Sequence, residues 1–482
     1  MVDLAAHDVR DAGQVVGTRL AICWQSLETT TRMHSPHYEL TPPGDRAASA
    51  KAIRRRIPRD SHTLWAPPPD RADPIALLME SNRGRLPSVA PIRFGRMLAS
   101  PFAFLRGAAV VMAHDLASTP ASGLHARLCG DAHVANFGGY ATPERSLIFD
   151  INDFDETLPG PWEWDLKRLV TSVVVLGREN GIGQDATRAA ALACARSYRK
   201  HIREYGPQPF LDIWYSVIDA GMTIAHFGAH PQPVADAFAR AEQRTNQTTL
   251  PKLGERAGRG YRIGDDPPLI THQRDALTRR LPEVLRGYRS SLADERRVLF
   301  DRYEVADIAR KVVGIGSVGL RCYAILLFGT DTSDPLFLQV KEVRESVLAP
   351  MVCPRPRQHQ GKRVVVGQRL MQAASDLFLG WSQCGRTDYV VRQLRDMKTH
   401  VALEDLHGDD LAAYATLCGW VLARAHACSG DAAKIGGYLG KGKRFDRAVV
   451  AFGEAYADQT ERDYAALVEA VRTGRVQAWA GA

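Results

Sequence analysis

Two short segments in the first third of the chain carry side chains that could transfer a phosphoryl group. The first segment, residues 129–136, holds Asp131, His133 and Asn136. The second, residues 146–156, is an apolar run that continues into four acidic side chains. In phosphoryl transfer, one carboxylate orients or deprotonates the attacking hydroxyl, while an Asn oxygen and a second carboxylate hold Mg²⁺ against the nucleotide phosphates. The two segments together contain each of these groups.

An alternative interpretation gives the same residues ordinary structural roles. Asp131 and Asn136 could cap turns, and the acidic stretch could be a solvated loop. However, the four acidic side chains lie within seven residues, directly after an apolar run. Carboxylates this close repel one another unless a cation compensates their charge. We therefore favour a cation-dependent site, on the residues taken together rather than on any single one.

Both segments resemble motifs of one fold. Residues 130–136, GDAHVAN, resemble the catalytic loop of aminoglycoside-phosphotransferase-type and other small-molecule kinases with the protein-kinase-like fold. Residues 152–155 resemble the metal-binding segment of these kinases. Residues 161–166 resemble the turn and helix that come next, whose Asp braces the catalytic loop.

The resemblance implies a role for each polar residue. Asp131 would orient or deprotonate the acceptor, Asn136 and Asp153 would bind Mg²⁺, and Asp155 would bind a second metal ion. His133 is grouped with the catalytic residues, although in such kinases it is either structural or assists the metal site, and the resemblance leaves this choice open.

The chain from about residue 57 to its end also resembles the bacterial family called domain of unknown function 2252. Its most recognisable stretches here are SPFAFLRGAA, CGDAHVANFG, FDINDFDETLPGPWEWDLKRL and RQLRDMK. The family supplies no activity, so the chemistry rests on the likeness to kinases.

A kinase also needs a nucleotide lobe, and the sequence places a candidate later in the chain. Gly314, Gly316 and Gly319 form a G-x-G-x-x-G motif after an apolar run. A dinucleotide-binding motif would open a helix after the glycines, whereas strand-like runs come next here, at 320–328 and 336–341. The pattern therefore resembles a kinase glycine-rich loop.

In this interpretation Gly314, Gly316, Ser317 and Gly319 cover the phosphates of ATP, and Lys341 contacts the α- and β-phosphates. The alternative for Lys341 is a lysine kept in water at a sheet edge. The three-strand context favours the phosphate contact.

The order of these elements is unusual, because the catalytic loop precedes the glycine-rich loop. We therefore expect an α+β, protein-kinase-like fold of two lobes whose elements are circularly permuted, which is physically admissible when chain termini lie close together. The glutamate that should pair with the lysine has no obvious position. Between Ser346 and Leu377 the only acid is Asp376, so Glu345 and a neutral substitute, Gln368, remain as candidates.

Length and composition set the broader expectations. With 482 residues, two lobes are expected, and 45% hydrophobic and 24% charged residues are ordinary for a soluble globular protein. The eight cysteines form no C-x-x-C pair, so we expect reduced thiols in a cytoplasmic protein. No apolar run is long enough for a membrane span, and no signal peptide is evident.

The expected domains derive from these patterns. They are a poorly ordered, basic and Pro-rich extension (1–56), a helical lobe with the catalytic and metal-binding loops (57–300), a β-rich nucleotide lobe (301–400) and C-terminal helices that pack on the helical lobe (401–482). The net charge of +8 and the basic run at 51–59, interpreted as a mobile arm, make nucleic acid a second-ranked partner behind ATP.

The predicted function is an ATP- and Mg²⁺-dependent phosphotransferase with an unknown small-molecule or protein acceptor. One alternative is nucleotidyl transfer on the same scaffold, with the nucleotide inverted so that its α-phosphate faces Asp131. A second is an inert nucleotide-binding regulator, and a third is an RNA-associated module. Oligomeric state does not follow from the sequence.

Four smaller predictions concern single elements and side chains. Residues 392–397 are expected to form the hinge that contacts adenine. Asp409 or Asp410 is expected to cap a helix, and His426 is expected to be structural. Arg106 and Lys167 could contact an anionic substrate, but the favoured expectation is that they form salt bridges on helix surfaces.

Overall fold

Residues 41–228, 230–258, 260–352, 358–394, 396–399 and 401–479 are described by a computed structural model. Helix makes up 52% and strand 16%, so the predicted mixture of helix and sheet is confirmed. The chain divides into two units, Met1–Pro42 and Pro43–Ala482, and every described helix and strand belongs to the second. The predicted disordered extension falls on residues 1–56, of which residues 1–40 lie outside the described part.

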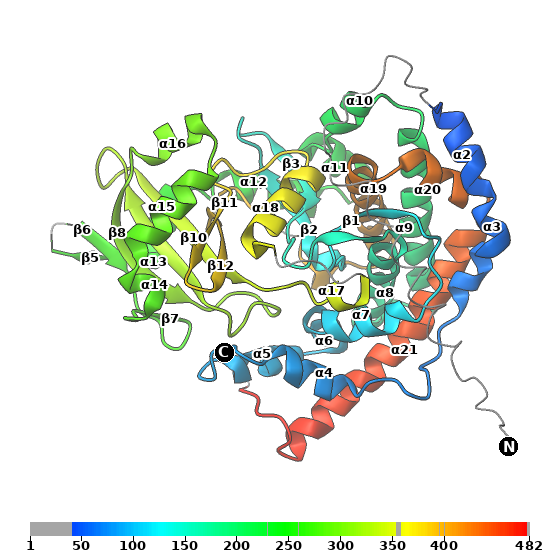
Figure 1. Cartoon of the computed structure of the whole chain (residues 1–482), viewed down its shortest axis with the longest axis horizontal. Helices are drawn as coiled ribbons and strands as arrows, with labels where there is room; N and C mark the ends of the chain where they lie inside the picture. The colour runs from blue at the N-terminus through cyan, green and yellow to red at the C-terminus, as the bar shows by residue number, and fades with distance from the viewer. Residues whose placement is uncertain are drawn as a thin grey trace, which may run out of the picture. The chain divides into compact units, whose positions relative to one another are not determined.

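A six-stranded antiparallel sheet dominates one part of the second unit (Figure 1). Its strand order is β11-β12-β10-β9-β8-β7. The central strands consist largely of β-branched, aromatic and leucine residues, and β10 is buried along its whole length, as expected for a strand covered on both faces. The bounds are β7 Ile270–Thr271, β8 Glu304–Lys311, β9 Cys322–Phe328, β10 Pro335–Val343, β11 Gly380–Cys384 and β12 Thr387–Gln393.

Different segments cover the two faces of this sheet. One face packs against α14–α16 through a core that includes Val284, Tyr288 and Leu338. The other face packs against α13 and the β5–β6 hairpin, where Leu250 and Phe337 lie in one cluster. The bounds are α13 Asn246–Leu253, β5 Gly254–Ala257, β6 Gly260–Ile263, α14 Ala276–Arg279, α15 Leu281–Ser291 and α16 Asp294–Phe300.

This packing corrects the predicted boundary at residue 300. The helical periodicity of residues 246–300 predicts that they belong to the helical lobe, yet these segments bury their apolar faces against the sheet. Helical periodicity indicates that a segment has a buried face, and it does not indicate which layer that face contacts.

The helical part is built around α8 and α9. Trp162, just before α8, stacks on Tyr198 of α9 with ring centroids 5.5 Å apart. α19 packs along α9, α21 packs along α8, and α18 lies between α19 and the sheet (Figure 1). The bounds are α8 Glu163–Glu179, α9 Gln184–Tyr205, α18 Gln360–Met371, α19 Asp409–Ser429, α20 Ala432–Leu439 and α21 Arg444–Arg472.

Two short antiparallel pairs, β1 with β4 and β2 with β3, sit on the helical part and carry the polar segments. β1 ends just before Cys129, and a short 3-10 helix (η2) joins the catalytic loop to β2. The acidic stretch comes directly after β3. The bounds are β1 His125–Leu128, η2 Val134–Asn136, β2 Phe137–Ala141, β3 Leu147–Ile151 and β4 Leu158–Pro161.

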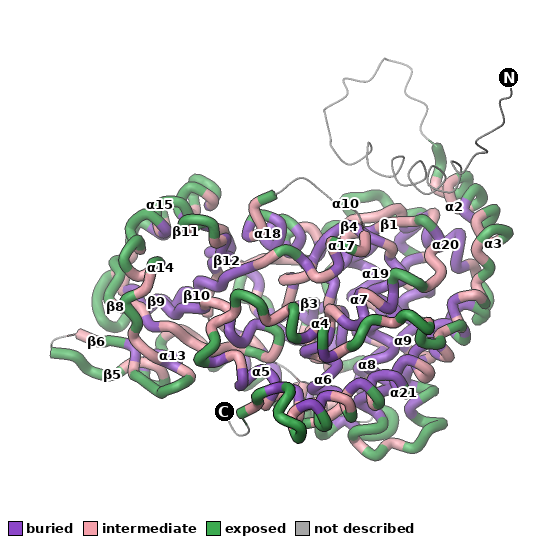
Figure 2. The backbone as a smooth tube through the Cα atoms, turned by 60° about the horizontal axis from the view of Figure 1, so that its bottom comes forward, coloured by how far each residue is buried: buried purple, intermediate pink, exposed green. Residues whose placement is uncertain are grey.

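The N-terminal elements of the second unit run along the helical part (Figure 2). Ser100 caps α6, because its hydroxyl accepts the amide of Ala103, and Pro101 occupies the first turn. The bounds are α2 Pro43–Lys51, α3 Ile53–Arg56, η1 Arg59–Thr63, α4 Pro74–Ser81, α5 Ala90–Met97, α6 Pro101–Gly107 and α7 Ala109–Ala117.

The expectation of a disordered, mobile basic arm is wrong for residues 43–59. α2 packs against α20, and Ala50 is buried. Arg54 Nε donates to the carbonyl of Tyr438 at 2.8 Å, and Arg59 donates to that of Leu439 at 2.6 Å. These carbonyls lie at the C-terminal end of α20, where backbone acceptors lack helical partners and the helix dipole favours cations.

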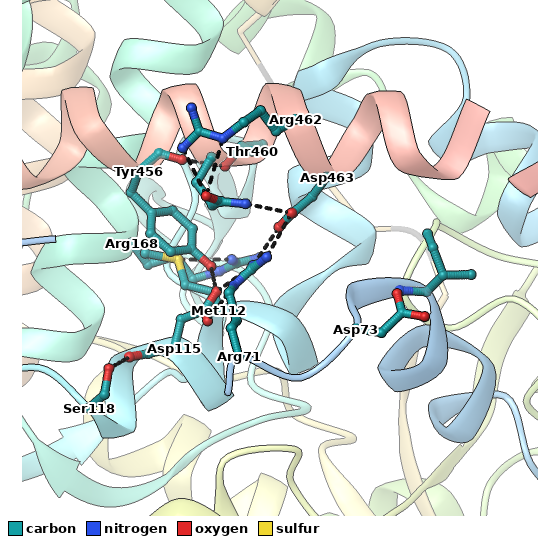
Figure 3. Close-up of polar contacts among 12 residues, drawn as sticks. Arg71, Asp73, Met112, Asp115, Ser118, Arg168, Tyr456, Thr460, Arg462 and Asp463 are labelled. Atoms are coloured by element: carbon teal, nitrogen blue, oxygen red, sulfur yellow. Dashed lines mark hydrogen bonds and ion pairs between the residues drawn. The ribbon is translucent and has the colours of Figure 1, made fainter. Parts of the chain in front are cut away.

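A buried polar network joins the N-terminal segment to the last helix (Figure 3). The Arg71 guanidinium donates to the carboxylates of Asp115 on α7 and Asp463 on α21. Tyr456 also donates its hydroxyl to Asp115, at 2.6 Å. Figure 3 places Arg168 next to this network, where its guanidinium lies 3.5 Å from the sulfur of Met112. The network therefore fixes α7, which in turn contacts Arg168.

The remaining elements are α10 Phe210–Tyr215, α11 Ala220–His226, α12 Gln232–Glu242, α17 Ala349–Val352 and η3 Leu403–Asp405. Within the described ranges, none of the helices combines the length and apolar character that crossing a membrane would require.

Candidate active site

The catalytic loop is fixed by Asp165 in the first turn of α8. Its two carboxylate oxygens accept the amides of Cys129 at 2.8 Å and Gly130 at 3.0 Å. Gly130 has a φ of +86°, and a Cβ there would lie 2.3 Å from the carbonyl oxygen of Glu156. Only glycine fits this close turn, which brings the loop against the acidic stretch.

His426 has the structural role that the sequence predicted. It is fully buried, with Nδ1 2.8 Å from the hydroxyl of Tyr198 and Nε2 3.3 Å from a carboxylate oxygen of Asp165. It thus orients the carboxylate that holds the catalytic loop. The prediction that Asp409 or Asp410 caps α19 is wrong, because Gly408, with a φ of +48°, is the N-cap and both acids lie in the first turn.

Asp131 is half-buried and ion-paired with Arg168 of α8. The Nε of Arg168 donates to Oδ1 of Asp131 at 2.6 Å, while Oδ2 lies 3.7 Å from Nε2 of His133. Burial raises the pKa of Asp131, and the charge of Arg168 opposes this rise. Burial, together with the charges of Arg168 and Arg106, lowers the pKa of His133 well below its usual value. Oδ2 of Asp131 is thus the oxygen left for a further hydrogen bond.

Asn136 and Asp153 lie on the same cavity as Asp131. The amide nitrogen of Asn136 donates to the backbone carbonyl of Asp131 at 2.7 Å. Burial alone would raise the pKa of Asp153, but the charges of Lys341 and Arg392 lower it below its ordinary value. Asp153 is therefore held as a carboxylate.

Lys341 of β10 reaches across to the acidic stretch. Its side chain is 3% exposed, and its ammonium forms an ion pair with Oδ2 of Asp155. Burial lowers the pKa of Lys341, but Asp153 and Asp155 raise it above its usual value. The structure therefore places Lys341 beside the predicted metal-binding segment and away from any water-exposed sheet edge.

The sequence did not show which acid pairs with Lys341, and the structure shows that this acid is Asp155. The proposed substitute, Gln368, instead donates its amide to Gln372 at 2.9 Å. Glu345 lines the cavity but forms no ion pair with Lys341 in the described part of the chain. The carboxylate of Asp155 is thus paired with Lys341. Its role as a ligand of a second metal ion stays a prediction.

The glycine-rich segment joins β8 to β9 above these residues. Ser317 Oγ lies 3.4 Å from Oδ2 of Asp155. Arg85 donates to the carbonyl of Gly316 at 2.8 Å, and the carbonyl of Gly319 accepts the amide of Leu86 at 2.7 Å. Arg85 and Leu86 thus bind backbone carbonyls of the glycine-rich loop.

Several backbone amides of the glycine-rich loop have no acceptor among the described residues. In the part of the chain that the structure describes, the amides of residues 314–317 donate no hydrogen bond to the protein. A Cβ at Gly314 or Gly316 would have no atom within 4 Å, so the loop borders open space there. Unpaired amides beside open space are the donors that phosphate oxygens require.

A cavity of about 500 Å³ lies among these groups. It is lined by most of the predicted site residues, namely Asp131, His133, Asn136, Asp153, Asp155, Gly314, Gly316 and Ser317. Gly319 and Lys341 lie behind its wall, Gly319 against Arg85 and Lys341 against Asp155. Segments far apart in the sequence therefore meet at one polar cavity.

Three backbone amides of the predicted hinge already have protein acceptors. The amide of Met397 donates to the carbonyl of Arg244 at 2.7 Å, and the amide of Leu394 donates to that of Phe337 at 2.9 Å. The amide of Gln393 donates to Asp376 at 2.6 Å. Arg392, Gln393 and Asp396 line a separate cavity of about 200 Å³, and contact with adenine there stays a prediction.

The donor set at the cavity fits Mg²⁺ bound together with phosphates. Among the described residues, no group of three His, Cys, Asp or Glu side chains could hold a metal ion by itself. Mg²⁺ does not need such a group, because it is usually bound by one or two carboxylates and completes its shell with water and substrate phosphates. Asn136 and Asp153 would supply the protein oxygens.

Sequence reasoning missed Arg168 and misjudged two other cations. Arg168 lies three residues after Asp165 and so shares its helix face, which is a signal that could have been used. Lys167 forms no surface salt bridge, because it is fully buried and donates to Thr119 at 2.8 Å. Arg106 is half-buried at the cavity.

Fold and site together define an α+β protein with a polar cavity where a six-stranded sheet meets a helical part. The chain belongs to the family described as uncharacterised protein conserved in bacteria, domain of unknown function 2252, whose model matches residues 85–470. No curated protein and no solved structure matches the chain.

Proposed function

We propose that this protein is an ATP- and Mg²⁺-dependent phosphotransferase with a kinase-like fold of two lobes. The observation that carries the proposal is the meeting of Asp131, Asn136 and Asp153 with the open amides of the glycine-rich loop at one cavity, with Lys341 paired to Asp155 behind its wall. These are the groups that kinases bring to the nucleotide phosphates, and each comes from the expected type of element. Chance placement on unrelated surfaces would not produce this combination.

The roles of the residues follow from their positions. Oδ2 of Asp131 accepts the hydroxyl proton of the acceptor, while Arg168 holds Oδ1. The acceptor oxygen bonds to the γ-phosphorus of ATP as the bond from that phosphorus to the bridging oxygen breaks, and ADP leaves. Lys341 and the amides of residues 314–317 bind the phosphate oxygens. Mg²⁺, held by Asn136 and Asp153, would neutralise charge on the phosphates. Catalysis is then mostly positioning and charge compensation.

The permuted order is part of the same proposal. The glycine-rich loop joins the first two long strands, β8 and β9, the lysine lies on the third, β10, and α18 comes before β11 and β12. After β12 the chain enters α19, whose His426 supports the catalytic loop from a position later in the sequence. This arrangement supports a kinase-like fold whose elements the chain visits in another order.

The test is a transfer assay with purified full-length protein, Mg²⁺ and either γ- or α-labelled ATP against metabolite and protein pools. A phosphotransferase transfers only the γ-label, and Asp131→Asn abolishes the transfer. If neither label is transferred and neither ATP turnover nor ATP binding is detected, the proposal fails.

Nucleotidyl transfer is the second candidate, and one observation favours it. The amides of Gln393, Leu394 and Met397 already donate to protein acceptors, so a base in the usual orientation would find few donors at the predicted hinge. An inverted nucleotide would place its base towards the apolar wall of the cavity, formed by Val110, Ile315 and Pro350. Transfer of the α-label to the acceptor would establish this second candidate and exclude the first.

A further inference from the structure

Arg106, near the C-terminal end of α6, is a cation without a partner. In the part of the chain that the structure describes, its guanidinium forms no hydrogen bond and no ion pair, and its buried Nε is unsatisfied. The guanidinium carbon lies 6.0 Å from the ring centroid of Phe102. The residue is half-buried and lines two cavities, so its Nε is withdrawn from water without a partner while the rest of its guanidinium can meet a ligand there.

The other arginines at the same cavity all have protein partners. Arg85 and Arg344 donate to backbone carbonyls that fix the N-terminal segment, and Arg93 donates to the carbonyl of Gly107 at 2.8 Å. Arg83 pairs with Glu80 at 2.8 Å on the surface. Arg106 is therefore the arginine at this wall whose donors are left for a bound anion.

The charge of Arg106 acts on the nearest acids, Asp131 and Glu179, but both already accept hydrogen bonds from other protein donors. Asp131 is already ion-paired with Arg168, and Glu179 accepts the amide of Phe102 at 3.1 Å. Arg106 thus adds a second positive charge, beside that of Arg168, near Asp131. Oδ2 of Asp131 is the oxygen to which we assign the proton of the acceptor hydroxyl.

A second cavity, of about 360 Å³, opens on the other side of Arg106. Its wall includes Phe102, Leu176 and Leu403, and Ala135 and Phe137 of the catalytic segment also line it. Glu179 and Glu404 line it too, so the anionic group of a bound molecule would be favoured at Arg106 and not beside these carboxylates. Arg106 lines both cavities. A molecule in the second cavity would lie against Ala135 and Phe137 and would meet the first cavity, which Asp131 lines, at Arg106.

We propose that Arg106 and the second cavity form the acceptor site, and that the acceptor is a small hydroxylated molecule carrying a carboxylate or phosphate group. The planar guanidinium donates two parallel hydrogen bonds to this oxyanion, and the hydroxyl of the acceptor then faces Asp131. The name acceptor rests on the proposed phosphotransferase function, whereas oxyanion binding at Arg106 does not depend on it.

The test measures binding of simple oxyanions by calorimetry, without Mg²⁺ or nucleotide. The probes are inorganic phosphate, for a phosphate group, and malonate, for a carboxylate. We expect the wild type to bind at least one of them, Arg106→Gln to weaken this binding at least tenfold, and Arg83→Gln, the matched surface control, to leave it unchanged. Which probe binds tells which group the acceptor carries.

Two further variants keep the result decisive. Because Arg106 has no hydrogen-bond partner, Arg106→Gln should melt within a few degrees of the wild type, and Arg106→Lys, which keeps the charge, should retain part of the affinity. Lys341→Met should leave oxyanion binding intact while removing the stabilisation by Mg²⁺-ATP, so failure of the nucleotide proposal remains distinguishable. Equal binding by wild type and Arg106→Gln, or loss in Lys341→Met alone, would overturn the inference.

Discussion

The side-chain amide of Asn136 donates a 2.7 Å hydrogen bond to the backbone carbonyl of Asp131. A carbonyl can only accept, so the NH₂ group of Asn136 faces Asp131 and its Oδ1 is left for another partner. Asp153 lines the same cavity and is held as a carboxylate by the charges of Lys341 and Arg392. This one hydrogen bond therefore orients the oxygen that would bind Mg²⁺.

Asp153→Asn should remove the stabilisation of the protein by Mg²⁺-ATP. A ligand at a hundred times its dissociation constant adds about 2.7 kcal/mol to the free energy of unfolding. The amide cannot supply the negative charge that the cation needs, so the melting shift at millimolar Mg²⁺-ATP should largely disappear. Thermal melting of both proteins with and without Mg²⁺-ATP measures this. A wild type that shows no shift would argue against every nucleotide-dependent function.

Asp131→Asn should abolish turnover and leave ATP affinity nearly unchanged, because Asp131 faces the acceptor side of the cavity. Loss of a general base costs roughly a hundred- to ten-thousandfold in rate. Asn is the better substitution than Ala, since its oxygen can still accept from the buried Arg168. Product formation and ATP binding should be measured on the same preparation. Equal turnover by the two proteins would remove Asp131 from the mechanism.

Arg54→Ala should destabilise the protein, whereas Arg55→Ala should not. Arg54 donates to backbone carbonyls at the end of α20, and hydrogen bonds to a charged group contribute on the order of 1.5–3 kcal/mol. Arg55, the next residue along the basic run, is exposed, so its removal should change the free energy of unfolding by less than about 0.5 kcal/mol. Urea unfolding of the three proteins compares them directly. Similar values for both variants would indicate that the basic run is not docked in solution.

His62 should make the protein sensitive to acid. Burial, helped by the charge of Lys167, lowers the pKa of His62 from 6.5 to about 3. The unfolded chain therefore binds a proton below about pH 6.5 that the folded protein refuses until about pH 3, so stability falls as pH falls through this window. The slope attributable to one such group is at most about 1.4 kcal/mol per pH unit.

His62→Phe should reduce this slope. The new ring can keep the edge-to-face contact with Phe445, and the hydroxyl of Tyr438 keeps its hydrogen bond to the carbonyl of Ile57 at 3.1 Å. The free energy of unfolding should be measured from pH 7 to pH 4 for the wild type, His62→Phe and the exposed-histidine control His407→Ala. Parallel pH profiles for wild type and His62→Phe would contradict the assignment.

Several features can be predicted from the sequence because they are local. In each of them, the residues that are neighbours in space are also neighbours in the chain. The spacing of Asp131 and Asn136 within one loop already implies the hydrogen bond that joins them. Ser100 before Pro101 predicts a helix start because capping is decided within four residues. The strand at β12 follows from its own apolar, β-branched residues.

Contacts across the molecule had no such local signal. That Asp155 pairs with Lys341, and that Arg168 pairs with Asp131, depends on the path of the whole chain. The composition of the basic run is that of a mobile arm, whereas its docking depends on the distant carbonyls at the end of α20.

By itself, the sequence determined that this protein has a loop with the side chains for phosphoryl transfer, an acidic segment beside it and a glycine-rich turn between strands. Only the tertiary structure decided that these meet at one cavity, that amides of the predicted hinge have protein acceptors, and that Arg106 is left without a hydrogen-bond partner among the described residues. The physical reason is that hydrophobic periodicity records which faces are buried, whereas the partner of each face is set by packing among distant segments.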